Sequence, residues 1–282
     1  MKRIALGTPS PDPPARRPHV TRAADRRRAI AAWGCGVALV MTFSPWLDAA
    51  ADRSFAWHMA QHMLLMYVAA PLLLLAWPAR TMLRALPSAA SRRVARVMHS
   101  GLLLALQHPV VAWLAFASVL WGAHFSSLYE AALANSATHE FEHALFFAAA
   151  LCFWQPVVGQ APAPWRLAYP LRMAYVMSAV PVGAFLGLAL VQTTRVLYPH
   201  YISTQESTAA AIADQHAGGA WMWIAGGLVF FSAFMLAGVA WARDERRLGG
   251  RLDAHTASAP VIPIAHGSLL RRRAGGPDTK AR

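Results

Sequence analysis

The sequence predicts an all-α membrane protein, a polytopic bundle of about six transmembrane helices with both termini in the cytoplasm. Apolar residues make up 56% of the 282 residues and charged residues only 14%, against about 25% charged in an ordinary soluble domain. The mean hydropathy is +0.34 although the formal net charge is +13. Apolar blocks separated by basic loops exclude a disordered chain, a coiled coil and most soluble enzymes.

The two ends of the chain are predicted to be disordered basic tails. The first, residues 1–28, holds five prolines and eight lysine or arginine residues and almost no large apolar side chain. The second, residues 243–282, is rich in arginine and then contains glycine and proline. Neither composition can bury enough apolar surface to fold. Residues 29–242 between them are the predicted transmembrane domain.

Six apolar blocks within this domain are the predicted helices. Each is long enough to cross about 30 Å of hydrocarbon as a helix, and continuous apolar runs lack the alternation of a membrane barrel. The first block exceeds the length of about 7–15 residues typical of a signal peptide core, so we expect it to be retained as a helix. The blocks are 29–47, 57–77, 101–123, 138–158, 170–191 and 217–242.

The distribution of basic residues predicts the orientation. Segments on one side of the six blocks hold 24 lysine and arginine residues, and those on the other side hold 2. Basic residues are retained in the cytoplasm, so both termini are predicted to lie there. Topology and lipid headgroups therefore account for the positive charge. We expect the lipid bilayer as a partner and no nucleic acid.

Polar residues gather at the predicted outer ends of the helices, where seven of the twelve histidines lie. His58 and His62 form an i,i+4 pair, as do His139 and His143. This spacing puts both rings of a pair on one helix face, so two facing helices would present four imidazoles to one metal ion. Histidines bonded to headgroups or loops are the structural alternative, although ionisable residues in membrane segments are usually functional. The full predicted metal site is His58, His62, His124, His139, His143, Asp214 and His216.

Copper is the metal that the neighbouring residues favour. Met59 and Met63 directly follow the two histidines of the first pair, and Met66 lies one turn further on. Thioether and imidazole ligands together suit copper, especially Cu(I), better than hard cations. Methionine also fills gaps in apolar cores, which is the alternative role of these side chains.

Two other functions are compatible with the same residues. The segment His139-Glu140-Phe141-Glu142-His143 matches the H-E-x-x-H motif, in which Glu140 would be the general base of an intramembrane metalloprotease. Alternatively, one histidine from each of two facing helices could hold the iron of a haem in an electron-transfer protein.

Several motifs together resemble the CtaG-type integral membrane family of cytochrome c oxidase assembly factors, which serves caa3-type oxidases. The resemblance implies a non-catalytic membrane assembly factor for a haem–copper oxidase, with cytochrome c oxidase subunits as partners, in the bacterial inner (plasma) membrane. It also implies a role in forming a copper centre. Family members often have a seventh helix, whereas six blocks are found here. The motifs are Trp57 to Leu65, Trp121 to Phe125, His139 to His143 with Phe153-Trp154-Gln155-Pro156, Tyr198 to Tyr201, and Asp214 to Trp223.

Overall fold

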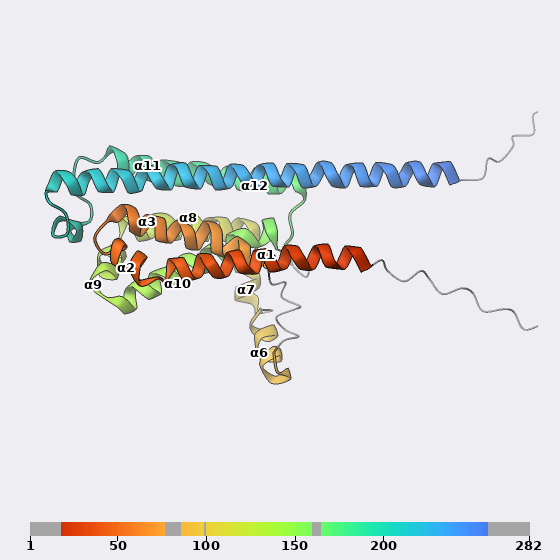
Figure 1. Cartoon of the computed structure of the whole chain (residues 1–282), viewed down its shortest axis with the longest axis horizontal. Helices are drawn as coiled ribbons and strands as arrows, with labels where there is room; N and C mark the ends of the chain where they lie inside the picture. The colour runs from red at the N-terminus through yellow and green to blue at the C-terminus, as the bar shows by residue number, and fades with distance from the viewer. Residues whose placement is uncertain (1–17, 77–85, 99, 160–164, 259–282) are drawn as a thin grey trace, which may run out of the picture. The chain divides into compact units, whose positions relative to one another are not determined.

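The computed structural model describes residues 18–76, 86–98, 100–159 and 165–258, and these form helices without a strand (Figure 1). Most helices begin with a proline or a polar capping residue, as expected for helix N-termini. The elements are α1 (Pro18–Thr42), α2 (Pro45–Ala51), α3 (Phe55–Met63), the π-helical turn η1 (Leu64–Ala69), α4 (Ala70–Ala76), α6 (Ser88–Met98), α7 (Gly101–Leu106), α8 (Pro109–Phe125), α9 (Leu128–Ala134), α10 (Ser136–Val158), α11 (Tyr169–Gln192), the short 3₁₀ helix η2 (Pro199–Ile202) and α12 (Thr208–Ser258).

Four helical stretches are long and apolar enough to cross a membrane, and two bent helix pairs raise the number to as many as six. The prediction of an all-α polytopic membrane bundle is therefore confirmed. The bends measure 51° between α1 and α2 and 65° between α8 and α9. The cytoplasmic location of the termini stays a prediction. The four stretches are Phe55–Ala76, Ser136–Val158, Tyr169–Gln192 and Thr208–Arg251.

The helices extend past the predicted tail boundaries. Helix α1 begins at Pro18 and covers the end of the tail predicted over 1–28, and α12 continues past 242 to Ser258. Arginine and alanine, which are frequent in both extensions, are strong helix formers without any core contact. A segment that lacks core-forming residues can therefore still be helical. Residues 1–17 and 259–282 lie outside the described part of the chain.

The predicted third helix, 101–123, is divided in two. Pro109 is the first residue of α8, and His108 before it has an extended backbone. Proline is favoured at this position because the first helical N–H has no partner within the helix. Helix α7 therefore ends at Leu106 instead of continuing into α8.

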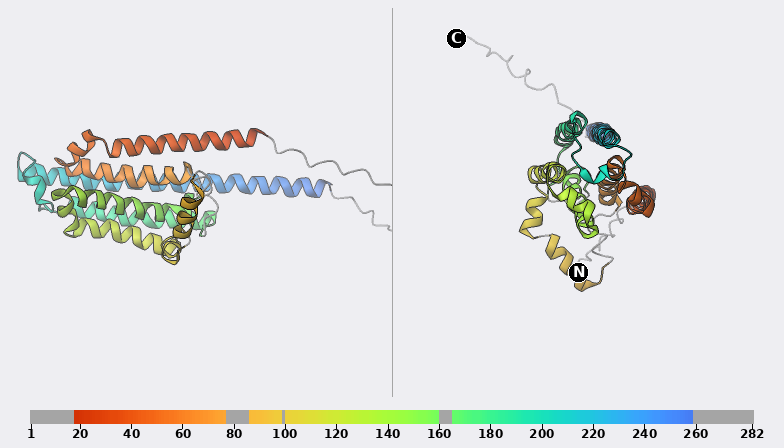
Figure 2. Two further views of the ribbon diagram at one scale, coloured as in Figure 1. Left: turned by 90° about the horizontal axis from the view of Figure 1, so that it is seen from below. Right: turned by 90° about the vertical axis from the view of Figure 1, so that its left-hand side faces the viewer.

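The described residues up to Gly238 form one compact unit, and those from Val239 to Ser258 form another. Within the first unit the long helices α1, α3, α8, α10 and α11 lie side by side with their axes roughly aligned, whereas α6 runs across them (Figure 2). Helix α10 packs on α8, α9, α4 and η1, and α1 packs on α4 and η1. In the second unit, the Trp241 indole donates a hydrogen bond to Glu245 over 3.2 Å.

The π-helical turn runs up to Pro71, which has no backbone N–H, and a tryptophan of α10 supplies the missing donor. The Ala70 N–H bonds to the Leu65 carbonyl five residues back. The same five-residue hydrogen-bond pattern would pair the Met66 carbonyl with the backbone nitrogen of Pro71, which carries no hydrogen. The Trp154 indole of α10 donates to the Met66 carbonyl instead, over 3.0 Å. This hydrogen bond ties α10 to the segment that follows His62.

Glycines allow α12 to approach α11 and α3 closely. A Cβ atom on Gly219 would lie 2.8 Å from the Gly187 carbonyl oxygen, and a Cβ atom on Gly218 would lie 2.3 Å from a ring carbon of Phe55. Both separations are too short for a carbon atom. Small residues at such crossings are typical of membrane helix packing. The start of α12 is thereby held against the first turn of α3.

Candidate functional site

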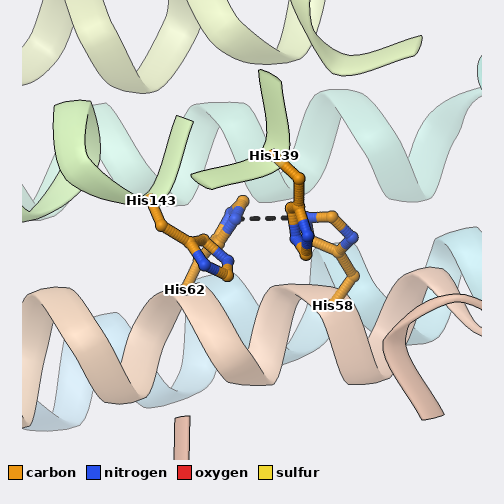
Figure 3. Close-up of side chains that lie close together, drawn as sticks. All are labelled: His58, His62, His139 and His143. Carbon is orange, nitrogen blue, oxygen red and sulfur yellow. Dashed lines mark hydrogen bonds between the residues drawn. The ribbon is translucent and has the colours of Figure 1, made fainter. Parts of the chain in front are cut away.

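Four histidines converge between α3 and α10, as the sequence predicts. His58 and His62 project from α3 toward His139 and His143 of α10 (Figure 3). Each ring offers one nitrogen, and these four nitrogens all lie within 4.8 Å of one another. Ligand nitrogens about 2.1 Å from a tetrahedral ion lie about 3.4 Å apart, so small side-chain movements would bring all four onto one ion.

Helix caps fix where α3 and α10 begin, and both histidine pairs lie within the first eight residues of these helices. The Ser54 hydroxyl caps α3 by accepting from the Trp57 N–H over 3.3 Å. In α10, the Asn135 side chain accepts from the backbone N–H groups of Ala137 and Thr138. Asn and Ser are favoured caps because their side-chain oxygens satisfy N–H groups without a helical partner. The two histidine pairs therefore lie near the same end of the bundle.

Hydrogen bonds assign the protons of His58 and His62. The Tyr201 hydroxyl donates to the Ala51 carbonyl over 3.1 Å, and it lies 3.3 Å from Nδ1 of His58. Because its proton is already used, Tyr201 accepts from the Nδ1–H of His58, whose Nε2 then carries a lone pair. That Nε2 lies 3.1 Å from Nε2 of His62, which must be the donor. A metal ion that binds both nitrogens would displace this proton.

A buried carboxylate, Glu142, completes the site. Its Oε2 lies 3.7 Å from Nε2 of His58 and 3.8 Å from Nε2 of His62. The Glu142 residue is 0% exposed, and His58, His62 and His143 are 1–4% exposed. Glu140, the candidate base of the H-E-x-x-H motif, is exposed. The tertiary structure therefore brings the other glutamate of this segment to the imidazoles.

Several buried polar atoms of this cluster have no hydrogen-bond partner within the described part of the chain. They are Nδ1 of His62, Nε2 of His139, Nε2 of His143 and both carboxylate oxygens of Glu142. Burial of unpaired polar atoms, and of a carboxylate above all, is unfavourable. A cation held by the imidazole nitrogens, with the Glu142 carboxylate beside it, would compensate this burial, so the donor set fits a metal ion.

The other three predicted ligands lie outside this cluster. Asp214 accepts from the Ser54 hydroxyl over 2.7 Å and from the Phe55 N–H over 2.6 Å, so it caps α3. The His216 ring lies 2.8 Å from the Thr193 carbonyl at the end of α11. His124 is buried, with Nε2 3.2 Å from the sulfur of Met59. Asp214 and His216 therefore join helices and do not face the four imidazoles.

The geometry supports neither alternative function. Rings from the two helices lie close together, with centroids 5.1 Å apart for His58 and His139 and 5.0 Å apart for His62 and His143. These distances leave no slot for a porphyrin between the helices. The protease mechanism needs Glu140 beside the metal, and that side chain is exposed instead.

Two residues at the site are outside the metal site predicted from the sequence. Glu142 is one of the two glutamates that flank the second histidine pair in the H-E-x-x-H segment, and Tyr201 is the last residue of a motif. Burial raises the pKa of Tyr201 well above its usual value, so its hydroxyl stays protonated and orients His58. The spacing of three from His139 places Glu142 beside the histidine face, but Glu140 has the same spacing from His143, so spacing alone does not select Glu142.

Comparison with known proteins identifies the family. Residues 14–244 match the family described as cytochrome c oxidase caa3 assembly factor, and the chain belongs to it. The chain is 32% identical over 240 residues to an uncharacterized protein of Mycobacterium leprae, and 30% identical to uncharacterized proteins of Mycobacterium bovis and Mycobacterium tuberculosis. Each match covers 81% of this chain and 36% of the relative, so the chain spans about a third of their length. No solved structure matches the chain.

Proposed function

From membership of this family and the geometry of the site, we propose that this protein carries copper for the assembly of a haem–copper cytochrome c oxidase. The observation that carries the proposal is the convergence of four histidine nitrogens within 4.8 Å of one another, beside the buried carboxylate of Glu142. The copper ion is the cargo of the protein and is not a catalytic cofactor. The protein acts on the oxidase subunits as a carrier and has no catalytic step of its own.

Copper is favoured over other metals by the donor set and by its surroundings. Imidazole suits copper, zinc, iron and nickel, and copper has the highest affinity among the divalent ions for such sites. Met59 lies directly after His58, and its sulfur is next to His124. This thioether makes the surroundings softer than those of a zinc site of histidines and carboxylates.

The position of the site supports delivery outside the cytoplasm. Both histidine pairs lie within the first eight residues of their helices, near one end of the bundle. The excess of lysine and arginine on the opposite side predicts that this end faces away from the cytoplasm, across the bacterial plasma membrane. Copper could then be taken up and released at the outer surface of that membrane.

The proposal is tested by the metal content of the purified full-length chain. We expect wild-type protein in detergent to bind copper from a buffered solution, and the double variant His58→Ala/His143→Ala to lose most of it. The matched control is His216→Ala, which removes a histidine near the same end of the bundle but outside the cluster. Equal copper content in all three proteins would refute the proposal.

The cellular role is tested in a deletion strain that expresses each variant. Cytochrome c oxidase activity in its membranes should return with wild-type protein and with His216→Ala, and stay low with the double variant. A blot for each protein separates loss of function from loss of the protein. Full oxidase activity with a normally abundant double variant would contradict the role of the cluster.

A further inference from the structure

A second group of soft ligands lies beside the four-histidine cluster. His62 borders a small cavity of about 10 Å³, which is room for about one water-sized sphere. Its wall includes His124 and four methionines, and one of them, Met222, comes from α12. Methionines from two segments that are distant in the sequence, 59–66 and α12, therefore line one cavity. The methionines are Met59, Met63, Met66 and Met222.

The hydrogen bonds of His124 leave one nitrogen directed at a sulfur atom. Its Nδ1 lies 2.7 Å from the Leu120 carbonyl, and because a carbonyl only accepts, Nδ1 carries the proton. In the neutral ring Nε2 then has a lone pair, and it lies 3.2 Å from the Met59 sulfur, which is also an acceptor. Two lone pairs face each other at this distance without a hydrogen between them.

Burial makes this arrangement hard to explain as ordinary packing. His124 is 4% exposed, Met59 is 1% exposed and Met66 is 2% exposed, so water does not separate the two acceptors. A cation bound by both atoms would turn the unfavourable contact into a favourable one. Thioether sulfur with one imidazole selects a soft ion, and Cu(I) is the soft ion that biological sites of this type hold.

We propose that His124 and Met59 form a second, Cu(I)-selective site, with sulfur from the other cavity methionines, next to the four-histidine cluster. The proposal rests on copper handling as the proposed function and adds the oxidation state of the ion. His62 belongs to both groups, because it is one of the four clustered histidines and also borders the cavity. A copper ion could pass between the two sites without leaving the protein interior.

The test compares the Cu(I) affinity of the full-length chain in detergent, without oxygen, against a chromophoric Cu(I) chelator. The double variant Met59→Leu/Met222→Leu removes two sulfurs at nearly constant side-chain volume, the exchange that cores tolerate best. We expect its Cu(I) affinity to fall by about 100-fold or more, since even residues outside the ligand shell typically cost about 10–100-fold. Met235→Leu is the matched control, because Met235 is 43% exposed and lies outside the cavity.

Two further measurements separate this proposal from the proposed function. X-ray absorption of the Cu(I)-loaded wild-type chain should show sulfur bound to copper, and the double methionine variant should lose that signal. Zn(II) binding reports on the four-histidine cluster and should be unchanged in the methionine variant. Copper bound only by nitrogen and oxygen, or a Cu(I) affinity unaffected by the methionine changes, would overturn the second site. Retained Zn(II) in His58→Ala/His143→Ala would count against the four-histidine site alone.

Discussion

Replacement of Glu142 by glutamine removes a buried charge while keeping the shape of the side chain. The carboxylate oxygen lies 3.7 Å and 3.8 Å from the Nε2 atoms of His58 and His62, so an ion bound to these nitrogens would lie at about 4 Å from the charge. Two unit charges at about 4 Å attract each other by about 4 kcal/mol at an effective dielectric constant of about 20.

That attraction is an upper limit on the contribution of the carboxylate, because ionisation of a buried carboxyl group has its own desolvation cost. Loss of groups that act beside a metal ion typically weakens its binding about 10–100-fold. We therefore expect Glu142→Gln to weaken copper binding by about 100-fold, or about 2.7 kcal/mol. The assay is a competition titration of the purified chain with a chelator of known copper affinity.

Glu140→Gln is the matched control, with the same substitution on the same helix two residues away. Glu140 is exposed, and an exposed charge contributes about 0–1 kcal/mol, so copper affinity should change by less than about fivefold. Unchanged copper binding by Glu142→Gln would refute the electrostatic reasoning. Loss of oxidase maturation by a normally abundant Glu140→Gln protein would instead support the metalloprotease hypothesis.

Three further predictions concern orientation of the ligands, stability and topology. Tyr201→Phe removes the hydroxyl that orients one imidazole, and copper affinity should fall about 10-fold in the same titration. Trp154→Phe leaves the buried Met66 carbonyl without its donor, which should cost about 1–3 kcal/mol of stability and lower the thermal midpoint of the purified chain. Reporter fusions after residue 130 should be active outside the cytoplasm, and fusions after residue 250 inside it.

Each of these predictions has an outcome that contradicts it. Copper binding by Tyr201→Phe equal to that of the wild type would show that the hydroxyl does not orient His58. An unchanged thermal midpoint for Trp154→Phe would mean that the Met66 carbonyl finds another donor. A cytoplasmic reporter signal after residue 130 would reverse the assigned orientation, and the histidine cluster would then face the cytoplasm.

The helical membrane fold follows from the sequence because its determinants are local. Block length and apolar content predict spanning helices, since a bilayer accepts only segments that satisfy their own backbone groups. The helix ends were less predictable. Pro109 starts α8 inside an apolar block, and α1 extends back to Pro18 because its arginines and alanines favour a helix even without a core.

The histidine pairs were also predictable, because i,i+4 spacing fixes the relative direction of two side chains on any helix. Only the tertiary structure determines that the helices of the two pairs face each other. It also separates Asp214 and His216 from the cluster, since these residues are near the same end of the bundle but bond to α3 and α11. Residues at one depth in a membrane can point in different directions, and the sequence does not specify which helices are neighbours.

Glu142 is the site residue whose position depends most on tertiary packing. Successive residues are rotated by about 100° around a helix, so Glu140 and Glu142 both lie about 80° from the middle of the face that carries His139 and His143, on opposite sides. The helical pattern treats the two glutamates alike. The packing of α3 against α10 buries Glu142 beside His58 and leaves Glu140 exposed. The sequence therefore determines that the two imidazoles of α10 share a face, and tertiary packing decides which carboxylate accompanies them, because burial depends on the neighbouring helix.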